Sequence, residues 1–191
     1  MKLILGSSSK WRAKVLESAG IHVDGFLSPD IDEKAIRHAD PERLVLALAH
    51  AKADALLPRI QEPVLLITVD QVVVCQGEIR EKPKDVEEAR VFLSSYIDHP
   101  AEAISGVVVT NTATGARAEG VDRASVLYKP SLKGEIENIL KHSFAMESSG
   151  ALVAENPLML ANVKESVGTP DSFMGMPVAL VKSLMAKAAG G

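Results

Sequence analysis

Residues 64–75 read VLLITVDQVVVC, a run of twelve residues that is apolar except at three positions. A run of aliphatic and β-branched residues of this kind is typical of a buried strand in an α/β sheet. Asp70 and Gln71 interrupt it, so we expect two strands that separate at this point. The alternative is a hairpin turn with the Asp70 carboxylate in solvent. If the carboxylate is buried, a metal ion or a cation has to meet it, because an unpaired buried charge is costly.

Strand-like and helix-like segments alternate on both sides of this run. Gly20 is a helix stop, and Asp40-Pro41 is a cap followed by a proline at the first helical position. Asp85 with Glu88 is a capping-box-like helix start, and Thr114-Gly115 is a hairpin signal. We therefore expect an α/β fold, a mixed twisted sheet with helices on its faces, in a single domain over 1–191. The expected strands are 2–5, 21–27, 101–112 and 118–128, extended segments are 148–155 and 159–165, and the helices end near 19, 57, 96, 140 and 188.

Composition narrows the class of protein. With 191 residues, 47% of them hydrophobic, the chain can form one packed core. A net charge of −4 creates no positive electrostatic potential that would attract nucleic acid, so we expect no nucleic-acid partner. Cys75 is the single cysteine, the five histidines have no zinc-ligand spacing, and no apolar stretch is long enough for a membrane span. These features predict a cytoplasmic protein without a zinc site or a membrane anchor.

The segment after the first strand is a candidate anion site. Gly6 to Ser9 (GSSS) lead directly into a helix, where exposed backbone N–H groups and serine hydroxyls bind anions well. Arg12 follows in the first turn, where the helix dipole makes a cation unfavourable. A phosphate bound at this position would make the cation favourable instead. An ordinary serine cap beside solvent-facing cations explains the same residues.

Three further charged positions are candidates. Lys52 lies within the apolar stripe of the 41–57 helix, where it either faces a phosphate site or extends from the edge of the stripe to water. Lys82 lies in a charge run before the next helix; the alternative, and the more common outcome for such runs, is a solvated surface segment. Glu33 belongs to a loop with Asp30 and Asp32; loop carboxylates suit Mg²⁺, and surface acidity is the alternative.

Five segments in order resemble the Maf family of nucleotide pyrophosphatases: LILGSSSKWR, DIDEK, LALAHAKA, VDQVVVCQGEIREKPKD and DSFMGMPVALV. The resemblance covers essentially the whole chain. It implies an α/β sheet with two lobes around a nucleotide cleft, as in inosine-triphosphate pyrophosphatases. The implied reaction is metal-dependent cleavage of a nucleoside triphosphate between its α- and β-phosphates, with Mg²⁺, Mn²⁺ or Co²⁺. A homodimer is also implied.

The resemblance assigns roles to individual residues. Asp70 matches the family's proton acceptor and metal ligand, and Glu33 matches an acidic, metal-linked position. The phosphate-binding positions are matched by Ser7, Arg12, Lys52 and Lys82. Two departures from the family pattern are Lys10 in place of proline and Ala13 in place of a second arginine.

The resemblance also implies a specificity for the nucleobase. The set Trp11, Gln71 and Glu155 resembles the family branch that acts on 7-methyl-GTP, whereas the branch that prefers pyrimidines has Arg, Thr and Gln. A tryptophan face attracts the cationic 7-methylguanine ring, and a glutamate can accept from guanine N–H groups. The alternative is that Trp11 belongs to the core and Glu155 is a surface charge. Alternative functions are the same reaction on dTTP or UTP, an inosine-triphosphate pyrophosphatase, and a non-catalytic nucleotide-binding regulator of cell division.

Overall fold

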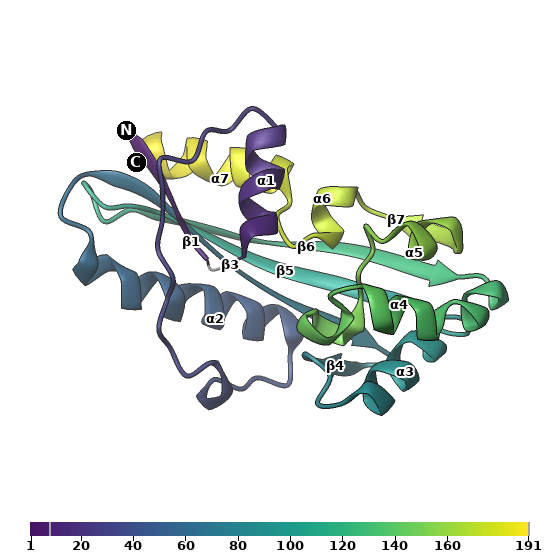
Figure 1. Ribbon diagram of the computed structural model, residues 1–191. Coiled ribbons are helices and arrows are strands. Elements are labelled where there is room, and N and C mark those ends of the chain that lie inside the picture. Colours follow the sequence, from purple (N-terminus) through teal and green to yellow (C-terminus); the bar gives the residue numbers. More distant parts are fainter. Residues whose placement is uncertain (8, 191) are drawn as a thin grey trace. The chain divides into compact units, whose positions relative to one another are not determined.

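The computed structural model describes residues 1–7 and 9–190, and Ser8 of the predicted anion loop lies outside them. Seven of the described strands form one mixed sheet in the order β2-β1-β3-β5-β6-β7, with β4 paired to β3 (Figure 1). β1 pairs in parallel with both β2 and β3, whereas β3–β4 and β6–β7 are antiparallel. The prediction of a mixed α/β sheet with helices around it is confirmed.

The chain forms two compact units. Unit 1 comprises Met1–Asp70, Ser105–Asp122 and Gly175–Gly191, and unit 2 comprises Gln71–Ile104 and Arg123–Met174. The strands are β1 Lys2–Gly6, β2 Gly25–Phe26, β3 Val64–Cys75, β4 Glu78–Arg80, β5 Ala101–Asn111, β6 Arg117–Tyr128 and β7 Val163–Val167. The α-helices are α1 Lys10–Ser18, α2 Pro41–Leu56, α3 Val86–Ser95, α4 Ile136–His142, α5 Pro157–Ala161, α6 Pro170–Phe173 and α7 Val178–Gly190, and the short 3-10 helices are η1 Glu33–Ala35, η2 Leu57–Arg59, η3 Pro130–Gly134, η4 Ala145–Glu147 and η5 Ser149–Ala151.

In unit 1 the alternation of β3 sorts its side chains between two faces. Leu65, Ile67 and Val69 join the core cluster that also holds residues of α1 and α7. Leu66 packs instead with Ala53 and Leu56 of α2, so α2 covers the opposite face (Figure 1). Even-numbered positions of β3 therefore point toward α2, and Asp70 is the last of these in unit 1.

The close approach of α2 to the sheet depends on two glycines. A Cβ at Gly6 would come within 2.6 Å of the Leu56 side chain and 2.7 Å of the Thr68 side chain. A Cβ at Gly106 would meet the α2 backbone at Val45 at 2.7 Å. The Thr68 hydroxyl also donates to the Ala49 carbonyl at 2.8 Å. These contacts hold α2 at a depth where its inward side chains meet the middle of β3.

Unit 2 has its own core. It is formed by buried residues of β3, β5, β6, α3, α4 and the 145–159 segment. Cys75, the single cysteine, lies in this core and is 1% exposed. Two fully buried tyrosines, Tyr96 and Tyr128, are its largest side chains.

Several local predictions are confirmed. Gly20 follows α1 with a positive φ of 75°. Asp40 caps α2 through the Glu42 and Arg43 N–H groups, and Asp85 caps α3 through the Glu88 N–H. β5 and β6 are sheet neighbours joined by a turn at Gly115.

Three segments correct the sequence-based expectation. β3 is one continuous strand of 12 residues through Asp70 and Gln71, not two strands or a hairpin turn. The 148–161 region forms no strand: it contains η5 and the helix α5, and a strand begins only at Val163. Asn156-Pro157 caps α5 in the same way as Asp40-Pro41 caps α2, so a cap signal was present there. The expected 21–27 strand is also reduced to the two residues of β2.

Candidate functional site

The candidate site lies at the carboxyl end of β1, beside the middle of β3, where Asp70 is the seventh of twelve residues. These neighbouring strands are parallel, with Gly6 opposite Thr68. The chain leaves β1 through α1 to β2 on one side, and reaches β3 on the other side through α2. α1 and α2 cover opposite faces, so this is a point where the strand order reverses, the usual place for a ligand in an open α/β sheet.

A buried ion-pair cluster occupies this position. The Lys52 Nζ lies 2.5 Å from Asp70 Oδ1 and 2.9 Å from Glu33 Oε1. Lys52 is 6% exposed and Asp70 is 7% exposed, whereas the Glu33 side chain is 55% exposed at the outer side of the cluster. Asp70 can remain inside a continuous strand because Lys52, from the helix that covers this face, compensates its charge.

Arg12 completes the cluster from α1. Its guanidinium donates to the Val69 carbonyl at 3.1 Å, the Gly175 carbonyl at 3.1 Å and the Ser7 hydroxyl at 3.3 Å. The Ser7 hydroxyl also accepts from the Ser9 N–H at 3.1 Å. Arg12 therefore ties α1, the β3 backbone and the turn at Gly175 together, a structural role that adds to the predicted phosphate contact.

The cluster shifts the acid–base behaviour of its members. Burial raises the pKa of Asp70, and repulsion from Glu33 adds to this, while Lys52 and Arg12 act in the opposite direction. Burial lowers the pKa of Arg12, and attraction to Asp70 and Glu33 counteracts it. A carboxylate with a raised pKa is a better proton acceptor than an ordinary aspartate.

The donor set of this cluster fits a divalent cation. The carboxylates of Asp70 and Glu33 both point at one ammonium nitrogen, so oxygen ligands from two elements meet at one cation position. Mg²⁺ is commonly held by one or two carboxylates, with phosphate oxygens and waters as its other ligands. In residues 1–7 and 9–190, no group of three or more His, Cys, Asp or Glu side chains is placed to hold a metal. Asp32, predicted beside Glu33, instead caps η1 through the Lys34 N–H.

The structure thus brings together Ser7, Arg12, Glu33, Lys52 and Asp70 in unit 1. The other predicted residues behave differently. Trp11 is on α1 and 41% exposed, so it is not a core residue, and the Lys14 ammonium lies 4.7 Å from its ring centre. A cation therefore already stacks on the ring that is expected to bind a cationic base.

Gln71, Lys82 and Glu155 belong to unit 2. The Gln71 amide donates to the carbonyls of Ser172 and Phe173 at 3.1 and 3.2 Å, so it anchors α6. Lys82 and Glu155 are exposed in the loops before α3 and α5. Their predicted roles toward a nucleotide remain predictions.

Sequence reasoning missed the polar anchors around Gln71. The Ser149 hydroxyl donates to the Gln71 carbonyl at 3.1 Å, and the Gly150 N–H donates to the Glu81 carbonyl at 2.9 Å. Gly150 is in the left-handed region, and a Cβ there would lie 2.5 Å from the Tyr96 hydroxyl. The ESSG segment is thus held against β3, the Glu81 loop and α3. Its serine–glycine composition was the available signal.

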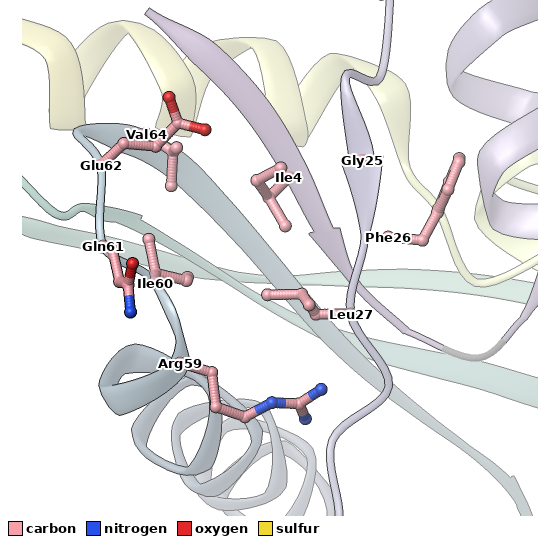
Figure 2. A pocket seen from close by; sticks show the side chains of 9 residues that line it. All are labelled: Ile4, Gly25, Phe26, Leu27, Arg59, Ile60, Gln61, Glu62 and Val64. Carbon is pink, nitrogen blue, oxygen red and sulfur yellow. The ribbon is translucent and has the colours of Figure 1, made fainter.

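An open groove lies elsewhere in unit 1, beside β2 (Figure 2). It has a volume of about 470 Å³ and is lined by Ile4, Gly25, Phe26, Leu27, Arg59, Ile60, Gln61, Glu62 and Val64. Val64 starts β3 and Asp70 is six residues further along, roughly 20 Å for an extended strand. The groove contains none of the ion-pair cluster, so it is not the candidate site.

The family model described as "Maf-like protein" matches residues 2–188. This chain belongs to the Maf family. The Maf match includes every residue of the ion-pair cluster, so the resemblance seen in the five sequence segments is confirmed. None of the described helices is long and apolar enough to cross a membrane.

Two Maf relatives align with nearly the full chain. A protein named 7-methyl-GTP pyrophosphatase from Dictyostelium discoideum is 40% identical, covering 97% of this chain and 96% of its own. A protein of the same name from Idiomarina loihiensis is 32% identical, covering 96% and 93%. A crystal structure titled nucleoside-triphosphatase / dITP/XTP pyrophosphatase, from Mycobacterium abscessus, matches with a TM-score of 0.42 and 15% identity, covering 67% of this chain and 73% of that chain.

Proposed function

We propose that this chain is a nucleoside triphosphate pyrophosphatase that releases pyrophosphate and a nucleoside monophosphate, with 7-methyl-GTP as its preferred substrate. Two relatives with that activity in their names align with it from end to end, at 40% and 32% identity. The observation that carries the chemistry is the cluster of buried Lys52 and Asp70 with Glu33, at the carboxyl end of β1 and beside the middle of β3.

In this proposal Asp70 accepts the proton of the attacking water. The oxygen of that water forms a bond to the α-phosphorus, the bond from this phosphorus to the bridging oxygen breaks, and pyrophosphate leaves. Burial raises the pKa of Asp70, which favours proton acceptance. The same burial excludes competing water from the carboxylate.

The cations stabilise charge that develops on the leaving pyrophosphate. Arg12 and Lys52 lie in the cluster with Asp70, and Lys82 is the predicted third cation. Ser7 directly follows β1 in the connection to α1, and its hydroxyl is fixed by two hydrogen bonds. Fixed donors and cations aimed at developing charge are a large contribution to phosphoryl-transfer catalysis.

A divalent cation is part of the proposal, held by Asp70 and Glu33. When bound, such an ion neutralises phosphate charge and lowers the pKa of a coordinated water. Both carboxylates already face one cation position, which Lys52 occupies.

The base preference rests on Trp11, Gln71 and Glu155. The exposed Trp11 ring accepts a cation in this structure, as stacking with 7-methylguanine requires. Gln71 supports this preference indirectly, because its amide holds the backbone of α6. Glu155 is exposed and therefore accessible to guanine N–H donors.

Pyrophosphate release from a panel of nucleoside triphosphates, with and without Mg²⁺ or Mn²⁺, tests the proposal. We expect kcat/KM for 7-methyl-GTP to exceed that for GTP, dTTP and UTP by more than about tenfold, a difference of ~1.4 kcal/mol in transition-state binding. If dTTP or UTP leads, the reaction stands and the base assignment is wrong. If nucleotides bind and none is hydrolysed, the chain is a nucleotide-binding regulator instead.

A further inference from the structure

We propose that Lys52 is an internal substitute for the divalent cation: its ammonium occupies the carboxylate pair in the metal-free protein and leaves when a metal binds. The inference rests on the proposed metal role of Asp70 and Glu33. It adds a second state of Lys52, in which the ammonium is free to contact a phosphate. Metal and lysine would then compete for the same oxygens.

The geometry of the cluster supports competition. One nitrogen lies within 2.9 Å of oxygens from two carboxylates that come from η1 and β3. Mg²⁺ and Mn²⁺ need carboxylate oxygens at about 2 to 2.2 Å, so neither ion fits while the ammonium remains between these oxygens. The Lys52 side chain is only 7% exposed, and its carboxylate partners lie against its ammonium group. The ammonium therefore has to move before a metal can contact both carboxylates.

The charges of the cluster also favour competition between Lys52 and a metal ion. In the metal-free cluster, Lys52 and Arg12 balance Asp70 and Glu33, and a bound divalent ion would add two positive charges at the same place. Repulsion between the ion and the ammonium favours release of Lys52, and the phosphates of a bound nucleotide would be its next partner. The nucleotide-free protein is expected to bind Mn²⁺ weakly by itself, because binding has to break the Lys52–Asp70 hydrogen bond and the Lys52–Glu33 ion pair.

The first test measures the affinity of the nucleotide-free protein for Mn²⁺ alone, by calorimetry and electron paramagnetic resonance. Lys52→Met removes the competitor and should tighten Mn²⁺ binding by about tenfold or more. Lys34→Met is the matched control, because it removes the same charge from an exposed residue next to Glu33. The control should change the affinity little, since an exposed charge is screened by salt. Equal or weaker binding by Lys52→Met would overturn the proposal.

The second test uses the wild-type chain, so it does not depend on the stability of Lys52→Met. The lysines are acetylated with an amine reagent, with and without Mn²⁺, and quantified by peptide mass spectrometry. Labelling of Lys52 should rise several-fold with Mn²⁺, relative to the exposed Lys187. Unchanged labelling at saturating Mn²⁺ would show that the ammonium stays between the carboxylates.

These tests separate this inference from the proposed function. Tighter Mn²⁺ binding by Lys52→Met together with no nucleotide hydrolysis by the wild type would support the substitution and contradict the pyrophosphatase role. Normal hydrolysis by the wild type together with unchanged Mn²⁺ affinity in Lys52→Met would support the pyrophosphatase role and contradict the substitution of Lys52 by the metal.

Discussion

Among the described residues, Lys52 of unit 1 and Arg80 of unit 2 are each 6% exposed, and these two cations are held in opposite ways. In unit 1, Lys52 is bound by the carboxylates of Asp70 and Glu33. In unit 2, Arg80 is 6% exposed and stacks on the rings of Phe92 and Tyr96, with centre distances of 4.8 and 5.1 Å. Arg80 donates to the Ser95 hydroxyl at 2.6 Å, and its Nε is buried without a hydrogen-bond partner among the described residues.

The two environments indicate a chemical role for Lys52 and a packing role for Arg80. A lysine between carboxylates can be exchanged for another cation, because its partners are negatively charged and one of them reaches solvent. An arginine between rings is held by its flat shape as well as by its charge, and the rings are part of the core. We therefore expect changes in unit 1 to affect turnover and changes around Arg80 to affect stability.

The largest expected effect is that of Asp70→Asn, which should remove nearly all turnover because an amide cannot accept the proton. Stability should not fall in parallel. Burial raises the pKa of Asp70, so its contribution to stability is complete at low pH and is lost as pH rises through that pKa. Asp70→Asn also takes one carboxylate from the buried Lys52 ammonium, which stays paired with Glu33, so the relief of burying one charge less is offset and stability should change much less than turnover.

Steady-state pyrophosphate release and thermal unfolding at neutral pH measure both effects of Asp70→Asn. A variant that retains more than about a tenth of the wild-type kcat, a loss under ~1.4 kcal/mol, would contradict the proton-acceptor role.

The comparison itself is tested by Lys52→Ala and Arg80→Met. Lys52→Ala should lower kcat by about tenfold or more, because a cation that stabilises the leaving group is lost. Arg80→Met should lower the free energy of unfolding by about 2 kcal/mol, since it removes the stacking and the Ser95 hydrogen bond, and should leave kcat of the folded enzyme nearly unchanged. Denaturant unfolding and turnover are measured on both variants. Stability loss with full specific activity in Lys52→Ala would assign that lysine to structure.

Lys82 tests whether the catalytic role extends to a residue of unit 2. Lys82→Ala should reduce turnover by about tenfold, since an exposed lysine that contacts the β- or γ-phosphate contributes through charge. Lys84→Ala is the matched control: it is also exposed in the same loop, and its Nζ pairs with Glu88 at 3.8 Å. Initial rates at saturating nucleotide compare the two. Similar rates for both variants would remove Lys82 from the site.

We expect the stability of unit 2 to depend on pH through Tyr96. Burial raises its pKa to about 12 from an ordinary value of 10.0, and the hydrogen bond and charge of Arg80 only partly oppose this. Its stabilising contribution is therefore complete below pH 10 and is lost as pH rises toward 12, by roughly 2 to 3 kcal/mol. Tyr96→Phe should lack this loss.

The measurement for Tyr96 is the free energy of unfolding of both chains from pH 7 to pH 12. At pH 7 the variant should be less stable by about 1 kcal/mol, because the hydroxyl donates to the Gly150 carbonyl. Parallel pH curves for the two chains would contradict the buried position of this phenol.

The smallest expected effect concerns the base. Glu155→Gln should reduce the preference for 7-methyl-GTP over GTP several-fold, because glutamine keeps one acceptor and loses the charge that strengthens the hydrogen bonds to guanine. The ratio of kcat/KM values for the two nucleotides is the readout. Glu147→Gln is a control of the same chemistry in η4. An unchanged ratio in Glu155→Gln would leave Trp11 as the main source of base preference.

Local sequence signals were sufficient for much of the fold. Asp40-Pro41, Gly20, Asp85 and Gly115 act on their own neighbours in the chain, so the helix ends and the turn between β5 and β6 follow from them directly. Asp70 was also identifiable by itself, since one carboxylate in an apolar run requires a partner. Where a local signal was overlooked, at Asn156-Pro157, a helix was taken for an extended segment.

The tertiary structure alone decided what meets Asp70. Glu33, Lys52 and Asp70 are 19 and 18 positions apart in the chain, and nothing local pairs them. They meet because α2 packs closely at Gly6 and Gly106, and because the alternation of β3 turns its even-numbered side chains toward that helix. For the same reason β3 continues through Asp70: the energy of a charge inside a strand depends on the element that covers it, and that element is distant in sequence.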